Sequence, residues 1–156
     1  MNRGAGTAAE DVRARIFFDH AMLRRAMAGL AREAAAAERG TGGAVDRVRT
    51  AAAEVRDAFE RHLSYEERVF LPLLREADAW GPVRVTHLLD EHRWQRAVLV
   101  AFVEDVTEGG KLVDEIADET AWLIRCLLDD MDEEEKVFRD GAALTASAIV
   151  VDQTDG

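Results

Sequence analysis

The sequence has one cysteine, two prolines and one tyrosine among its 156 residues. A single cysteine, Cys126, excludes a disulfide within the chain and gives no sign of an oxidising compartment. The scarcity of proline, together with abundant Ala, Leu, Glu and Arg, favours helices over strands. No apolar run approaches the ~20 residues that span a membrane, and the N-terminus lacks the hydrophobic core of a signal sequence. We therefore expect a cytoplasmic protein.

Basic residues are in the minority: 20 Lys and Arg stand against 31 Asp and Glu, which gives a net charge of −11. Such a charge repels phosphate backbones and anionic lipid surfaces. The sequence therefore predicts neither a nucleic-acid partner nor a membrane partner. The length fits one domain with a substantial core.

Three short segments rich in Gly, Asp or Pro interrupt the helical pattern, at residues 40–43, 78–82 and 108–110. They predict four long helices joined by short loops, that is, an all-α, up-down-up-down antiparallel four-helix bundle. We expect one domain over residues 1–141 and a partly disordered tail over residues 142–156. Pro72 lies inside the second helical segment, where it predicts a kink or an early end.

The most informative pattern is a motif that occurs twice. Residues 62–70 read His-Leu-Ser-Tyr-Glu-Glu-Arg-Val-Phe, and residues 130–138 read Asp-Met-Asp-Glu-Glu-Glu-Lys-Val-Phe. An acidic residue followed by a histidine precedes each copy, at residues 19–20 and 91–92. The chain thus resembles one helical hairpin written twice, with Asp130 at the place that His62 takes in the first copy.

Apolar residues recur every three or four positions, which defines the helix faces turned to the bundle core. The stripe of the second segment is 48, 52, 55, 59, 62, 66, 69 and 73, and that of the fourth is 113, 116, 120, 123, 127, 130, 134 and 137. Ionisable residues interrupt these two stripes and the corresponding apolar stripe of the first segment. They are His20, His62, Glu66, Asp130 and Glu134. In the third segment, His92 lies on a stripe with Val85 and Leu99.

We expect these ionisable residues to lie at one height in the bundle. In antiparallel helices, residues at one height are equally distant from the intervening turn. The midpoint between 20 and 62 is residue 41, that between 66 and 92 is 79, and that between 92 and 130 is 111. Each midpoint falls in or next to one of the three breaks, so all four helices contribute to one layer.

Burying three imidazoles and three carboxylates together is costly unless bound cations neutralise the carboxylates. A His and a Glu four residues apart project from one helix face, so such a helix offers two ligands. Mixed imidazole and carboxylate ligands suit iron, manganese or zinc, and two ions bridged by a carboxylate fit such a site. The predicted metal ligands are His20, His62, Glu66, His92, Asp130 and Glu134.

Other residues near this layer are weaker candidates. His87 could replace His92 as a ligand if the third helix is rotated, paired with Glu91 four residues later. Residues that could support the metal site from beside it are Asp19, Tyr65, Glu91 and Trp94. Surface exposure or ordinary core packing is the alternative for each of them.

At these residues the chain resembles the hemerythrin-like (HHE cation-binding) family, over roughly residues 12–140. The usual family pattern is a His on helix 1, His-x3-Glu on helix 2, a His on helix 3 and His-x3-Glu on helix 4. The chain supplies His20, His62 with Glu66, Glu91-His92, and Asp130 with Glu134. The resemblance implies a four-helix bundle that holds two non-haem iron ions. Manganese or a single metal ion are the alternatives.

The departure from the family pattern is Asp130, where a histidine is usual. Anionic oxygen ligands stabilise higher oxidation states and favour reductive cleavage of O2 or peroxide over reversible O2 binding. The sequence therefore predicts a di-iron oxidoreductase that uses O2 or peroxide, acts on a small molecule and receives electrons from an unidentified donor. The alternatives are a protein that reversibly binds, stores or senses O2, NO or iron, and a metal-free interaction bundle.

Overall fold

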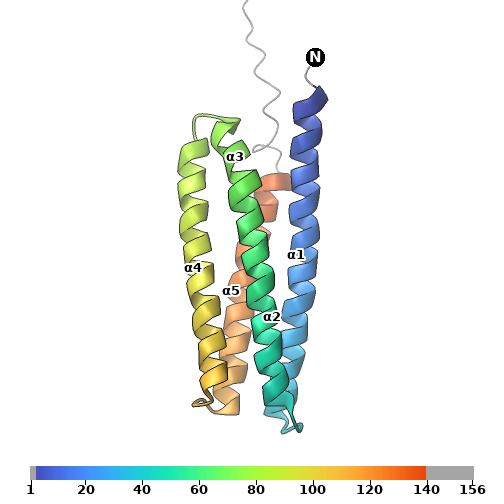
Figure 1. Ribbon diagram of the computed structural model, residues 1–156, viewed down its shortest axis with the longest axis vertical. Helices are drawn as coiled ribbons and strands as arrows, with labels where there is room; N and C mark the ends of the chain where they lie inside the picture. The colour runs from blue at the N-terminus through green and yellow to red at the C-terminus, as the bar shows by residue number, and fades with distance from the viewer. Residues whose placement is uncertain (1–2, 140–156) are drawn as a thin grey trace, which may run out of the picture.

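The computed structural model describes residues 3–139, with side chains from residue 9 onward, and these residues form helices joined by short turns. The elements are α1 (Arg3–Glu38), α2 (Ala44–Tyr65), η1 (Glu66–Phe70), α3 (Leu71–Ala77), α4 (Gly81–Glu108) and α5 (Val113–Arg139). α1, the continuous α2–η1–α3 segment, α4 and α5 run alternately in opposite directions (Figure 1). The predicted four-helix bundle is confirmed, and the predicted tail, residues 142–156, lies outside the described residues.

The three predicted breaks are the turns between these four long segments. Gly43 precedes α2 with φ of 71°, and Gly109 ends α4 with φ of 74°, a left-handed backbone that glycine adopts without strain. Gly81 is the first residue of α4, and a Cβ at this position would clash with the carbonyl oxygen of Arg75. Turns this short and close hold consecutive segments antiparallel.

Two apolar clusters fill the bundle on either side of the ionisable layer. In α1, His20 lies between Ile16, a member of the smaller cluster, and Leu23, a member of the larger one. The segment from α2 to α3 repeats this order, with Phe59 in the larger cluster and Phe70 in the smaller one. Burial of a large apolar side chain contributes roughly 1.5–3 kcal/mol, so the two clusters offset the cost of burying the polar layer between them.

The core-facing stripe of the second segment changes register at η1. The sequence places Val69 and Leu73 on the stripe, but they are 36% and 38% exposed, whereas Phe70 and Leu74 are buried. The hydrogen bonds of a π-helix span five residues instead of four, so a π-helical turn adds one residue to the helix. The core face therefore moves by one position after Glu66, which itself stays buried.

The register change comes immediately before Pro72, which the sequence predicts to disturb this helix. Proline has no N–H to donate to the carbonyl four residues earlier. The α-helix ends at Tyr65, and Leu71 N–H donates to the carbonyl of Glu66, five residues earlier. The proline is thus accommodated by a π-helical turn, and the chain continues without a break into α3.

The stripe of α5 also differs from the predicted one near its C-terminal end. Met131, Glu135 and Phe138 are buried there, whereas Val137 is 43% exposed. An α-helix has 3.6 residues per turn, so a stripe of alternating four- and three-residue steps drifts by about 20° per heptad. Because of this drift, the core face passes to the next residue, and Asp130 lies at its edge, half-buried.

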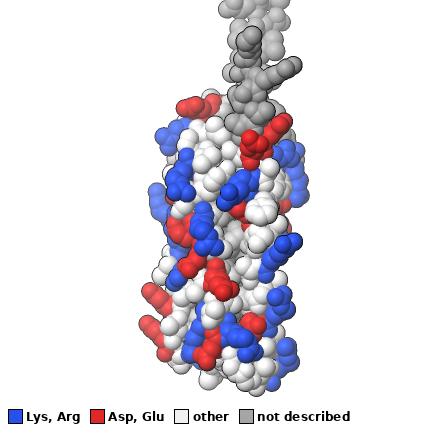
Figure 2. Space-filling model, turned by 45° about the vertical axis from the view of Figure 1, so that its right-hand side comes forward, with Lys and Arg blue, Asp and Glu red and all other residues white. Residues whose placement is uncertain are grey.

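The surface carries mixed charges. Figure 2 shows basic and acidic side chains interspersed over one face of the bundle. Many form ion pairs, such as Arg47 with Glu33 at 2.7 Å and Lys111 with Glu119 at 2.6 Å. Exposed pairs of this kind contribute only about 0–1 kcal/mol each, so the fold depends mainly on the apolar clusters. None of the helices within residues 3–139 is long and apolar enough to cross a membrane.

Candidate metal centre

Four side chains converge between the two apolar clusters: His20 of α1, His62 of α2, Glu66 of η1 and Glu134 of α5. One potential ligand atom from each lies within 4.8 Å of those of the other three. His20 is fully buried, and His62 and Glu66 are 4% and 1% exposed. The group combines imidazole nitrogens with carboxylate oxygens and is compact enough for one metal ion to contact all four residues.

Glu66 connects this group to His92 of α4. Its Oε1 lies 3.2 Å from His62 Nε2, and its Oε2 lies 3.1 Å from His92 Nε2. Each carboxylate oxygen therefore faces one imidazole, and the two imidazoles come from different helices. A carboxylate in this position can bridge two metal ions, one on each side.

Two of the imidazoles are held from behind by carboxylates. His20 Nδ1 lies 3.0 Å from Glu135 Oε1, and His92 Nδ1 lies 3.0 Å from Glu67 Oε1. Because a carboxylate accepts the proton on Nδ1, the Nε2 lone pair of each ring points into the cluster. This is the tautomer that binds a metal through Nε2.

Each supporting carboxylate is held in turn by an arginine four residues after the histidine. Arg24 donates to Glu135 Oε1 at 2.7 Å, and Arg96 donates to Glu67 Oε1 at 2.6 Å. Burial raises the pKa of both carboxyl groups, but the hydrogen bonds from arginine and histidine outweigh it and leave each pKa below its usual value. Both carboxylates therefore stay anionic, and each can accept a hydrogen bond from the N–H at Nδ1 of its histidine.

His62 has a longer contact of the same kind. Its Nδ1 lies 3.8 Å from Asp19 Oδ2. Arg15 Nε donates to both oxygens of Asp19, at 2.9 and 3.0 Å. Asp19 therefore faces His62 across the α1–α2 interface and not His20, its neighbour in the sequence.

The protonation of the inner groups is strongly shifted by their surroundings. Burial lowers the pKa of His62 to about 4. Burial, together with the neighbouring carboxylate of Glu134, raises the pKa of Glu66 well above its usual value. The cluster by itself thus favours a neutral imidazole and a protonated carboxyl group, the state that a bound cation would replace.

Three polar atoms of the cluster lack a hydrogen-bond partner. Among the described residues, nothing forms a hydrogen bond to His62 Nδ1, Glu66 Oε1 or Glu134 Oε1, all of which are buried. Buried polar groups without a partner are rare in proteins. A metal ion bound to the two carboxylates would satisfy their oxygens, so the residues present fit a bound cation.

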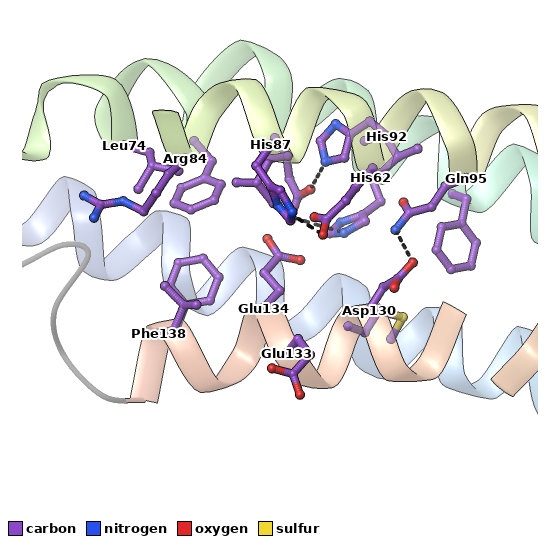
Figure 3. Close-up of a pocket in the computed structure, with 18 of the residues that line it drawn as sticks. His62, Leu74, Arg84, His87, His92, Gln95, Asp130, Glu133, Glu134 and Phe138 are labelled. Atoms are coloured by element: carbon purple, nitrogen blue, oxygen red, sulfur yellow. Dashed lines mark hydrogen bonds and ion pairs between the residues drawn. The ribbon is translucent and has the colours of Figure 1, made fainter. Parts of the chain in front are cut away.

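Asp130 lies beside this cluster and not within it. Its Oδ2 accepts a hydrogen bond from Gln95 Nε2 at 3.1 Å, which turns the carboxylate towards α4 (Figure 3). The structure therefore brings together five of the six predicted ligands, His20, His62, Glu66, His92 and Glu134. It places the sixth, Asp130, on the wall of a neighbouring cavity.

The alternative ligands of α4 lie closer to the surface. The side chain of His87 is 75% exposed and its Nδ1 lies 3.2 Å from Glu91 Oε1. His92, by contrast, is buried against Glu66. His92 is thus the α4 histidine that faces the cluster, and Glu91 pairs with His87.

The two aromatic candidates make contacts outside the ionisable cluster. The guanidinium carbon of Arg15 lies 5.0 Å from the centre of the Tyr65 ring. Trp94 packs edge-on against Trp122 with ring centroids 6.4 Å apart. Neither Tyr65 nor Trp94 is among the residues that line the cavity beside the cluster.

The cavity has a volume of about 420 Å³ and lies between the α2–η1–α3 segment, α4 and α5. α4 and α5 meet at few points, whereas the other neighbouring helices pack closely, so this side of the bundle is more open. His62, Glu66, His92 and Glu134 belong to the wall. The rest of the wall is mainly apolar and includes Phe59, Leu63, Phe70, Leu74, Leu88, Met131 and Phe138.

The apolar stripes do not identify the carboxylates and arginines that support His20 and His92, but the repeated motif contains a sequence pattern for them. Both copies of the motif contain two consecutive glutamates, at residues 66–67 and 134–135. The sequence His-x3-Arg also occurs twice, at residues 20–24 and 92–96. The first glutamate of each pair enters the cluster, and the second lies behind a histidine of the other hairpin.

Comparison with known proteins agrees with this geometry. The family model described as the hemerythrin HHE cation binding domain matches residues 11–140. No curated protein and no solved structure matches the chain. The matched range contains every residue of the cluster, its supporting carboxylates and the cavity wall. The chain therefore belongs to the hemerythrin family of HHE cation-binding domains.

Proposed function

We propose that the protein is a non-haem di-iron oxidoreductase that reduces O2 or peroxide and acts on a small molecule held in the cavity. His20, His62, Glu66 and Glu134 would hold one ion. His92 would hold the other, together with Glu66 and Glu134. Imidazole and bridging carboxylate ligands in the core of a helical bundle suit iron.

The observation that carries this proposal is the cavity beside the cluster. A protein that only binds a diatomic gas needs a small, closed pocket. The cavity of about 420 Å³ lies within the range of roughly 300–1,000 Å³ that is typical of small-molecule sites. Because metal-ligand candidates form part of its wall, a molecule bound there would contact the metal centre directly.

When bound, two iron ions supply the electrons and the Lewis acidity for reduction of O2 or peroxide. The residues of the chain orient the centre: Glu135 and Glu67 fix the rings of His20 and His92. The rings of Phe70 and Phe138, whose centroids are 5.0 Å apart, line the cavity beside the cluster. Such apolar walls exclude water and strengthen electrostatic interactions at the centre.

The test is metal analysis followed by Mössbauer spectroscopy. Protein expressed with iron should contain two iron ions per chain. Exposure of the anaerobic ferrous protein to O2 should convert both ions to the ferric state, and removal of the gas should not reverse the change. Recovery of the ferrous spectrum after removal of O2 would support the reversible-binding alternative. An empty site after expression with iron would exclude both functions.

A further inference from the structure

The cavity contains a carboxylate that no described residue neutralises. Asp130 accepts one hydrogen bond, from Gln95 Nε2, and within residues 9–139 it forms no ion pair. A carboxylate in a largely apolar wall is costly unless it is paired with a positive charge. The wall therefore favours a ligand that brings its own cation to Asp130.

Gln95 presents a second acceptor to the same space. Its side chain is 7% exposed, and its Oε1 has no hydrogen-bond partner among the described residues. The orientation of the amide is fixed, because an ionised carboxylate only accepts and the NH2 group must face Asp130. Both residues line the cavity, so together they offer a ligand two acceptors, a carboxylate and an amide oxygen.

The other charged groups of the wall have partners or belong to the metal centre. Glu66 and Glu134 are metal-ligand candidates. The remaining pairs are Arg84 with Asp78, His87 with Glu91, and Glu133 with Lys136. Arg84 lies at the opposite end of the cavity from Asp130 in Figure 3, so it does not neutralise that carboxylate. Among the carboxylates of the described cavity wall, apart from the two metal-ligand candidates, Asp130 is thus the one for which no ion-pair contact is formed.

We propose that the cavity binds a small organic ammonium ion, with its nitrogen at Asp130 and Gln95 and its apolar body against Phe59, Leu63, Leu88 and Met131. An ammonium group carries three donors and a positive charge, which matches a carboxylate and an amide oxygen. Aromatic side chains in the wall add favourable cation–π contacts. The identification of an amine as the substrate rests on the proposed function, under which the amine is the molecule acted on. The binding of the amine does not depend on that function.

The test is calorimetric titration of the iron-loaded protein with probes of similar size and different charge. These are 2-phenylethylammonium and n-hexylammonium as cations, 2-phenylethanol as a neutral molecule and 3-phenylpropionate as an anion. We expect both cations to bind, the alcohol to bind about tenfold or more weakly, which is about 1.4 kcal/mol, and the anion not to bind. Failure of both cations to bind, or equal affinity for cation and alcohol, would overturn the proposal.

Asp130→Asn keeps the size of the side chain and removes its charge. We expect it to lower the affinity for the ammonium probes by about tenfold or more and to leave the affinity for the alcohol unchanged. Asp129→Asn is the matched control, because Asp129 is the neighbouring residue on the same helix, is exposed and does not line the cavity. The control should change neither affinity.

Iron content separates the proposed role of Asp130 from metal binding. Asp130→Asn should retain two iron ions per chain, and loss of one ion would assign Asp130 to the metal and overturn the proposal. The O2 reaction is measured separately on the same samples. Reversible O2 binding by the parent protein would refute the proposed function and leave the amine site standing. Failure of the parent protein to bind the ammonium probes, with O2 reduction intact, would refute the amine site alone.

Discussion

The two hairpins of the bundle place matching residues around one centre. The first hairpin contributes His20, His62, Glu66 and Glu67, and the second contributes His92, Asp130, Glu134 and Glu135. Their supporting residues are exchanged: Glu67 lies behind His92, and Glu135 lies behind His20. Neither hairpin therefore completes its half of the centre alone.

The first position of the motif holds His62 in one half and Asp130 in the other. His62 is 4% exposed and directs Nε2 into the cluster. Asp130 has a shorter side chain, accepts from Gln95 and borders the cavity. Both residues line the cavity, but α1 and α2 pack closely beside His62, whereas α4 and α5 meet at few points beside Asp130. The exchange at this position of the repeat thus replaces an imidazole of the cluster with a carboxylate directed at Gln95.

Glu66 is the residue that the two halves share, so its removal should have the largest effect. Glu66→Ala deletes the carboxylate that faces both His62 and His92. We expect the purified protein to lose most of its iron from both positions, measured by elemental analysis. Glu133→Gln, which removes an exposed carboxylate, should retain the iron. Retention of two iron ions by Glu66→Ala would show that the halves do not share a bridging ligand.

The supporting carboxylates should have similar effects in the two halves. Glu67→Gln and Glu135→Gln each replace the anionic acceptor behind one histidine with a neutral amide, and such changes typically weaken metal binding about 10–100-fold. Competition with a chelator measures the affinity.

The matched controls are Glu60→Gln and Asp132→Asn, which pair with Arg96 and Arg24 but contact no histidine. These controls should leave metal affinity nearly unchanged. An effect in one half only would contradict the twofold arrangement.

Asp130→His makes the second half resemble the first. The larger ring should fill part of the cavity and add a nitrogen ligand, so we expect a more stable O2 complex and slower irreversible oxidation. A change of about tenfold in the oxidation rate corresponds to about 1.4 kcal/mol in the barrier. Stopped-flow spectroscopy of the ferrous protein measures this rate. Unchanged O2 chemistry would show that Asp130 does not determine the outcome.

The smallest expected effect concerns the metal-free protein and its pH dependence. Burial and Glu134 raise the pKa of Glu66 above its usual 4.5. A group with a raised folded-state pKa contributes its full stability below the unfolded value and loses it as the pH rises through the folded value. Glu66→Gln should therefore be more stable than the parent in chelator, by a margin that grows from pH 5 to pH 8. Urea denaturation measures the margin; one that shrinks with rising pH would contradict this assignment.

The local features of the fold could be predicted from the sequence. Glycine and proline marked the turns, and the apolar periods marked the helices. The common height of His20, His62, Glu66 and His92 followed from the uniform rise of a helix. These predictions depend on backbone geometry, which is the same in every helix.

The parts that were wrong or not predicted depend on tertiary packing. The stripe failed at Val69 because a π-helical turn shifts the register, and it failed at Val137 because the face of α5 drifts. Glu67 and Glu135 belong to runs of acidic residues that are typical of a solvated face. Only the positions of His92 and His20 on the neighbouring helices show that these glutamates have partners.

X-ray diffraction from crystals of iron-loaded protein, with anomalous data at the iron edge, tests the central claim most directly. We predict two anomalous peaks, one on each side of the Glu66 carboxylate, with Asp130 hydrogen-bonded to Gln95 and not bound to either ion. A single peak, or a direct bond from Asp130 to iron, would contradict it.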